Sequence, residues 1–307
     1  MEKASDDAKP RQLDIFADSR DVMLRNDLAA AVERRDAAAG RRALDELAEG
    51  YPADHLLAPA RALMATLAVH EQGVAALPLD ADSLAAARQH LSAHIVPAAE
   101  AVLGRRTGHA WLAPLWRDLA ERAAHLPWSG ASPDLHAAPL WLAAGAWTQA
   151  AESAGGIESW RRIPAPLAWM IEARYRIEGL DAIWPLLAEL AWLAPARLDG
   201  LLQVLADPLL QRLHRRFEDH FEAPADAGGS RNALAWFPAW VLTDTPALAP
   251  HLALAEPGQS GEPERGMRLM VMLLGLERQG RHHDLMAGRR ALRDLCAPLY
   301  GAYMATR

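Results

Sequence analysis

Apolar residues recur along most of this chain at spacings of three and four, the pattern of an amphipathic α-helix. Leu24 and Leu28 belong to one such face, and Leu44 and Leu47 belong to another. The pattern predicts helices over these ranges: 20–34, 37–50, 55–70, a helix from Ser83 that kinks or breaks at Pro97, 108–125, 138–153, 164–178, 180–194, 197–205, 207–221, 264–279 and 281–304. No segment alternates apolar and polar residues as a half-buried strand does, so we predict an all-α fold.

Clusters of Pro, Gly and Ser interrupt the helical pattern at 127–138, 223–230 and 256–263. Such clusters mark loops and linkers between periodic segments. We therefore expect four regions along the chain: a flexible N-terminal tail at 1–18, a helical region at 19–126, a Trp-rich helical region at 138–222 and a C-terminal helical region at 232–307.

Two short phrases are repeated within the chain. Ala-Gly-Arg-Arg-Ala-Leu occurs at 39–44 and at 287–292, and Leu-x-Glu-Leu-Ala occurs at 44–48, as Leu-Asp-Glu-Leu-Ala, and at 187–191, as Leu-Ala-Glu-Leu-Ala. A proline follows the second phrase, at Pro52 in one case and at Pro195 in the other. Internal repetition in a helical background is typical of stacked helical hairpins.

Segments 43–52 and 187–195 resemble the second helix and closing proline of a tetratricopeptide repeat. The resemblance implies an α-solenoid of antiparallel hairpins with a concave surface that binds other proteins. An irregular helical bundle is the alternative, because Ala- and Leu-rich helices look alike by composition.

The composition limits the kinds of reaction that this chain could catalyse. The chain has 307 residues, 51% hydrophobic and 23% charged, with a net charge of −7. Its only lysines are Lys3 and Lys9, which excludes a Walker-type phosphate loop or a Schiff-base lysine in the folded body. Cys296 is the single cysteine, and we expect it to be a small residue of the core. Because the N-terminus is polar and no long apolar run is present, we expect a cytoplasmic protein. We also expect no metal and no cofactor.

The sharpest short motif is Gln12-Leu13-Asp14-Ile15-Phe16. It resembles the pentapeptide by which bacterial proteins bind the DNA sliding clamp. The resemblance implies that Gln12 occupies a polar subsite and that Leu13, Ile15 and Phe16 fill an apolar pocket, which requires an extended, accessible segment. Alternatively, these apolar residues pack on the first hairpin as a hydrophobic staple.

Three further groups are candidates for function. Trp236, Phe237 and Trp240 follow a breaker cluster and are expected to form an exposed aromatic cluster able to anchor a partner. His214 and Glu218 lie four residues apart and could share a metal ion on one helix face. Paired arginines could follow a phosphate backbone if they were aligned, at 41–42, 105–106, 161–162, 215–216 and 289–290.

No motif of a known catalytic class is present. We therefore expect a non-enzymatic protein–protein interaction scaffold or adaptor that docks a peptide or helix and is recruited to the sliding clamp through 12–16. We expect neither a membrane partner nor direct nucleic-acid binding. The alternatives are a nucleic-acid-associated protein using the arginine pairs, and a helical enzyme or metal protein using His214 and Glu218.

Overall fold

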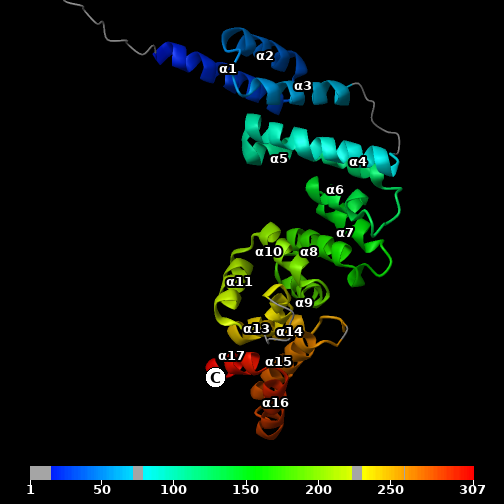
Figure 1. Ribbon diagram of the computed structural model, residues 1–307, viewed down its shortest axis with the longest axis vertical. Coiled ribbons are helices and arrows are strands. Elements are labelled where there is room, and N and C mark those ends of the chain that lie inside the picture. Colours follow the sequence, from blue (N-terminus) through cyan, green and yellow to red (C-terminus); the bar gives the residue numbers. More distant parts are fainter. Residues whose placement is uncertain (1–14, 72–78, 223–229, 259) are drawn as a thin grey trace, which may run out of the picture. The chain divides into compact units, whose positions relative to one another are not determined.

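The computed structural model describes residues 15–71, 79–222, 230–258 and 260–307 (Figure 1). Within these residues the chain is helical and contains no strand, which confirms the all-α prediction. The chain folds as two compact units, Met1–His125 and Leu126–Arg307. None of the helices in the described ranges is both long and apolar enough to cross a membrane.

Unit 1 is built from helical hairpins, and its last helical segment, residues 96–123, is two helices that meet at a kink at Gly104. The first three helices pack in sequence, and the last packs on the first and third. Trp111, in the helix that follows Gly104, donates its indole N–H to the Val32 carbonyl at 2.8 Å, which ties this helix to the first one. The helices are α1 (Ile15–Glu33), α2 (Ala37–Gly50), α3 (Leu57–Glu71), α4 (Ala81–His90), a π turn (Leu91–Ile95) and α5 (Val96–Ala123).

The structure corrects three boundaries in unit 1. Helix α1 begins at Ile15 rather than near residue 20. The cap of α4 is Asp80, whose carboxylate accepts the Ser83 N–H at 2.8 Å. The break predicted at Pro97 lies instead at Gly104, which adopts φ 75° and ψ 162°. Pro97 follows directly on the π turn, where the Val96 N–H already bonds to the Leu91 carbonyl five residues back, so the shifted hydrogen-bond pattern accommodates the missing proline N–H.

Unit 2 contains shorter helices joined by 3₁₀ turns. Two of the long predicted segments are each two helices, because the chain turns at Gly145 and again at Cys296. The helices are α6 (Ala137–Ala143), α7 (Trp147–Gly155), α8 (Pro164–Glu178), α9 (Trp184–Leu193), α10 (Pro195–Leu205), α11 (Pro208–His220), α12 (Ser230–Ala233), α13 (Phe237–Asp244), α14 (Ala249–Leu252), α15 (Glu262–Gln279), α16 (His282–Leu295) and α17 (Ala297–Ala305).

One hydrophobic core spans unit 2 and joins the two regions expected to be separate, 138–222 and 232–307. The Phe217 ring of α11 meets Phe237 edge-on at 5.5 Å between centroids and Trp240 at 5.6 Å. Trp236, Phe237 and Trp240 are only 2%, 1% and 4% exposed. The expectation of an exposed aromatic cluster is therefore wrong, because these rings fill the space between α11 and the C-terminal helices.

The same turn closes three of the helical hairpins. Arg35, Gly145 and Gly280 follow α1, α6 and α15 with φ of 56°, 68° and 68°. Each donates its N–H to the carbonyl three residues back, and the next residue donates to the carbonyl five residues back. This is the Schellman arrangement, in which a left-handed residue satisfies the last carbonyls of a helix.

The repeated phrases are found at helix crossings and helix ends. A Cβ placed on Gly40 would lie 2.6 Å from Met64 Sδ, and one on Gly288 would lie 2.8 Å from Leu273 Cδ2. However, Gly40 lies five residues after Arg35, the left-handed residue of the preceding turn, whereas Gly288 lies eight residues after Gly280. The two glycines differ by nearly one helical turn, so they do not occupy equivalent positions in their hairpins. The repetition therefore marks close helix contacts, and the tetratricopeptide-like solenoid stays a prediction.

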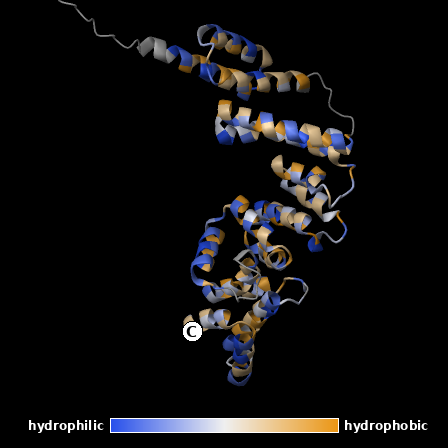
Figure 2. Ribbon diagram, viewed as in Figure 1, coloured by the Kyte–Doolittle hydropathy of each residue, from blue (hydrophilic) through white to orange (hydrophobic). Residues whose placement is uncertain are grey.

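Figure 2 shows hydrophobic and hydrophilic residues on the same helices, as the sequence pattern predicted.

Candidate functional site

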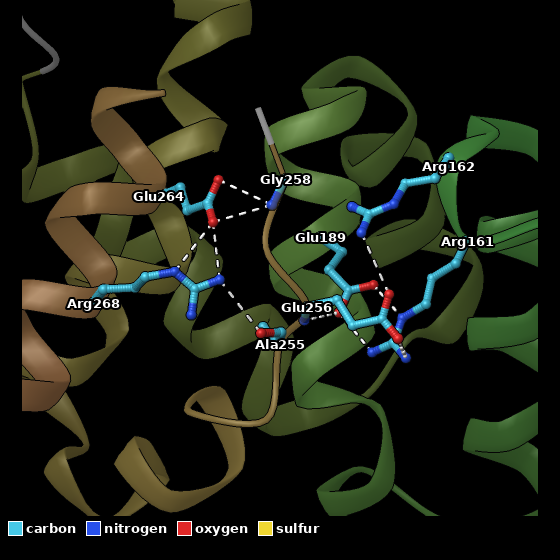
Figure 3. A network of polar contacts seen from close by, with 8 residues as sticks. All are labelled: Arg161, Arg162, Glu189, Ala255, Glu256, Gly258, Glu264 and Arg268. Carbon is cyan, nitrogen blue, oxygen red and sulfur yellow. Dashed lines mark hydrogen bonds and ion pairs between the residues drawn. The ribbon is translucent and has the colours of Figure 1, made fainter. Parts of the chain in front are cut away.

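A network of buried charges holds the loop between α14 and α15 in unit 2 (Figure 3). Two carboxylates reach this loop from its two sides: Glu189 of α9, whose side chain is 3% exposed, and Glu264 of α15, at 4%. Carboxylates are almost never buried so deeply unless they are paired, so each must be neutralised locally.

Glu189 is paired through a two-pronged contact with Arg161. The Arg161 Nε and Nη2 atoms donate to the two Glu189 oxygens at 2.5 and 2.6 Å. Glu189 also accepts the backbone N–H of Glu256 at 2.6 Å, and Arg161 Nη1 donates to the Glu256 side chain at 2.6 Å. Bidentate Arg–carboxylate pairs are geometrically specific, so this contact fixes the start of the loop against α9.

Glu264 holds the rest of the loop. Its carboxylate accepts the N–H groups of Gly258 and Ser260 at 3.0 and 2.9 Å, and the Nε and Nη2 atoms of Arg268 at 3.1 and 2.9 Å. Burial alone would raise the pKa of Glu264, but the hydrogen bonds from Arg268 and the two backbone N–H groups outweigh it and lower that pKa. Glu264 is therefore an ionised structural acceptor and is unsuited to act as a general acid.

A cavity of about 310 Å³ adjoins this network. Trp192, Leu193, Pro257 and Pro263 contribute its apolar wall, and the Arg268 guanidinium lies 5.7 Å from the Trp192 ring centroid. The charged groups at this cavity bond to one another and to the loop backbone. The network thus shapes the loop. Sequence reasoning missed the contacts of Arg161, Glu189 and Glu256 because these residues lie at least 28 positions apart along the chain.

A larger and more apolar groove of about 520 Å³ lies within unit 1, between α3, α4 and α5. Alanines of α3 and α4 contribute small side chains to it, and the π turn contributes two buried apolar ones, Leu91 and Ile95. Val69 stands 59% exposed beside them. The described residues that line the groove are Ala62, Ala65, Thr66, Val69, Ala87, His90, Leu91, Ile95, Leu115, Asp118, Leu119 and Arg122.

A third cavity, of about 590 Å³, lies beside α10 and α11 in unit 2. Asp199 and Glu218 line it. The buried His214 Nε2 atom lies 3.6 Å from Glu218 Oε1 and 3.9 Å from Asp199 Oδ1, and His214 does not line the cavity. Across the described part of the chain, no group of three or more His, Cys, Asp or Glu side chains is arranged to hold a metal ion.

The N-terminal motif lies partly outside the described residues. Gln12 and Leu13 are outside them, whereas the backbones of Ile15 and Phe16 form the first turn of α1. This start differs from the extended conformation expected for the whole pentapeptide, because the helix begins within it.

Several of the paired arginines bond to carboxylates of their own unit. Arg161 and Arg162 bond to Glu256, Arg216 pairs with Asp244, and Arg289 bonds to Glu277. These four side chains are therefore engaged in contacts within unit 2.

Comparison with family models, with curated proteins and with solved structures gives no match for this chain.

Proposed function

We propose that this chain is a non-enzymatic protein-interaction adaptor whose unit 1 groove binds the apolar face of a partner helix. The observation that carries the proposal is the groove itself, an apolar channel of about 520 Å³ between three helices. A helix laid in such a groove inserts the side chains that it carries at spacings of three and four residues.

The lining of the groove suits large apolar side chains. The small side chains of Ala62, Ala65 and Ala87 leave space in the groove. Leu91 and Leu119 contribute apolar surface around this space. Each large apolar anchor would contribute about 2 kcal/mol of burial before the costs of association and ordering. Two or three such anchors would contribute about 4–6 kcal/mol before those costs, so we expect weak binding, with a dissociation constant no tighter than roughly tens of micromolar.

The rim of the groove is polar and of mixed charge. Asp118 and Arg122 pair at 3.3 Å on α5, and His90 lies on α4. A partner helix with an apolar stripe and flanking polar residues of both signs would match this rim, so we propose an amphipathic helix rather than a uniformly apolar one.

The test is selection of helical peptides from a displayed library against the full chain, followed by binding measurements on two variants. Ala65→Arg places a long charged side chain in the groove, and Ala101→Arg places the same side chain on an exposed position of α5 that does not line it. Arg is a good helix former, so both variants keep their helices.

We expect the selected peptides to carry apolar residues at helical spacing and to lose at least about tenfold in affinity on Ala65→Arg, which is about 1.4 kcal/mol, while Ala101→Arg binds normally. Peptides that bind Ala65→Arg as well as they bind the wild type would overturn the groove assignment.

We further propose that residues 12–16 recruit the adaptor to the bacterial sliding clamp, on the resemblance of Gln12-Leu13-Asp14-Ile15-Phe16 to the clamp-binding pentapeptide. Because α1 begins at Ile15, binding in an extended form must unwind the first turn of this helix. The first turn of a helix is the part that unwinds at least cost, since its N–H groups have no partner within the helix.

The measurement is binding of the full chain to purified sliding clamp. A deletion of 1–18 would shorten α1, so point variants are preferable: Gln12→Ala with Leu13→Ala, and Ile15→Ala with Phe16→Ala. Alanine preserves the helix, so we expect clamp binding to be lost with unchanged helicity. If the second pair instead lowers melting cooperativity and leaves clamp binding intact, the staple interpretation is correct.

A further inference from the structure

Two histidines of unit 1 lie together on one exposed helix face. His90 is the last residue of α4, and His94 follows four positions later, within the π turn Leu91–Ile95. Both residues are exposed, and the centroids of their imidazole rings are 5.4 Å apart. Residues four positions apart share a helix face, and the ring contact shows that His90 and His94 do so across the π turn as well.

The fold makes no other use of these two rings. Among the described residues, neither His90 nor His94 has a hydrogen-bond or ion-pair partner. Other histidines are engaged: His136 Nδ1 accepts the Ala138 N–H at 3.2 Å, and His220 Nδ1 bonds to the carbonyl of its own helix at 2.9 Å. The nitrogens of His90 and His94 are therefore available to a ligand from solution.

The separation of the two rings fits a pair of ligands to one metal ion. With each nitrogen about 2.1 Å from the metal, tetrahedral coordination places the centroids of two imidazole rings roughly 5 Å apart. The observed separation is 5.4 Å, and the ring planes are inclined at 48° rather than stacked face to face. Rotation about the side-chain bonds of two exposed residues is sufficient to close the remaining difference.

We propose that His90 and His94 chelate one divalent ion of the late first-row transition metals. Imidazole is a ligand that Cu²⁺, Ni²⁺ and Zn²⁺ prefer, whereas Mg²⁺ prefers oxygen. Two protein ligands leave the other coordination positions to water. This site departs from the sequence-based expectation that the chain binds no metal. It does not depend on the binding of a helix in the unit 1 groove, although His90 also lines that groove.

The experiment is calorimetric titration of the full chain with CuCl₂, ZnCl₂ and MgCl₂ in a non-coordinating buffer. The imidazole signals of His90 and His94 are followed by NMR during the Zn²⁺ titration. We expect one equivalent of Cu²⁺ or Zn²⁺ to bind with a shift of both imidazole signals. Cu²⁺ should bind more tightly than Zn²⁺, as the general affinity order of these ions requires, and Mg²⁺ should not bind at the pair.

Single variants test whether both histidines hold the same ion. His90→Gln and His94→Gln each leave one imidazole and should weaken binding at least about tenfold, since the second imidazole acts at high effective concentration once the first has bound. Both positions are exposed and glutamine is a good helix former, so the fold is retained. His109→Gln is the matched control, because it removes an exposed histidine of α5 and should leave the affinity unchanged.

A double variant tests the spacing. Ser92→His combined with His94→Gln keeps the number of histidines but sets the two imidazoles two positions apart, where side chains do not face each other. This variant should bind as weakly as His94→Gln alone. Wild-type affinity in the spacing variant, or in either of the single variants His90→Gln and His94→Gln, would overturn the proposal.

Discussion

Single residues stabilise this protein most clearly where a charge is buried and fully paired. Glu189 joins Arg161, the Glu256 backbone and hence three segments of unit 2. Such a pair contributes little when compared with an apolar replacement, but removing one partner leaves the other charge uncompensated.

Glu189→Gln should therefore lower the free energy of unfolding by about 2–3 kcal/mol, a value reduced from the fully buried case because Arg161 is 25% exposed. Urea denaturation measures this loss. The control is Glu158→Gln at an exposed position of the same unit, which should change stability by less than about 0.5 kcal/mol. Equal effects of the two variants would contradict the buried-pair account.

Glu264 predicts a dependence of stability on pH. Because its folded pKa is lowered, its contribution is fully present above the unfolded pKa of about 4.3 and is lost as pH falls through the folded pKa. The stability difference between wild type and Glu264→Gln should thus be constant near neutral pH and shrink below about pH 4.3. Urea titrations across this range provide the measurement, and a difference that grows on acidification would refute the assignment.

For Glu172 of α8 we expect the opposite dependence of stability on pH. Burial raises the pKa of its carboxyl, and the nearby charge of Arg176 offsets this only in part. The folded state then binds the proton more tightly than the unfolded state, so ionised Glu172 destabilises the fold near pH 7. Glu172→Gln should raise the unfolding free energy at neutral pH, with the gain vanishing in acid. A loss of stability at pH 7 would show that the ionised carboxylate has a stabilising partner.

At the scale of elements, the hairpin turns require a residue in the left-handed backbone conformation. Gly280 closes α15 with φ 68°, and a Cβ placed there would meet no atom within 4 Å. The cost of a side chain at this position is therefore purely one of backbone conformation.

Gly280→Ala should destabilise the protein by about 1 kcal/mol, since a left-handed conformation costs an L-residue that much. Gly275→Ala is the matched variant, inside α15 and also with open space around the added Cβ. It should stabilise by about 0.5–1 kcal/mol, because alanine is the better helix former. Thermal unfolding of both variants tests the pair, and the same sign for both would be inconsistent with the turn.

At the scale of the whole molecule, the chain divides into two compact units, and unit 2 holds residues of both 138–222 and 232–307. The core of unit 2 includes residues on both sides of 223–229, with Phe217 packed against Phe237 and Trp240. A fragment ending at residue 222 would expose Phe217 and Phe221, which are 2% and 8% exposed in the full chain.

Fragment 126–307 should therefore unfold cooperatively by itself, whereas 126–222 should lack a cooperative transition and show weak near-ultraviolet circular dichroism. Equilibrium urea unfolding followed at both near- and far-ultraviolet wavelengths makes the comparison. Cooperative unfolding of 126–222 would show that the central helices form a core without the C-terminal ones.

The amphipathic spacing of Leu28 or Leu47 was sufficient to predict helices, because helical periodicity is a local property. Glycine and proline likewise marked most loops. The sequence by itself also determined that no lysine lies beyond Lys9. These features depend on residues within a few positions of one another.

Tertiary structure alone decided which apolar residues are covered and which charges meet. Trp236 and Trp240 looked available because a breaker cluster precedes them, yet both are buried: Phe217 of α11 packs on Trp240, and Gly266 of α15 lies against Trp236. The Arg161–Glu189 pair and the unit 1 groove join helices distant in sequence, and Asp199 reaches His214 only through the packing of α10 and α11. Local periodicity determines which face of a helix is apolar, but only the packing of the other helices determines what that face contacts.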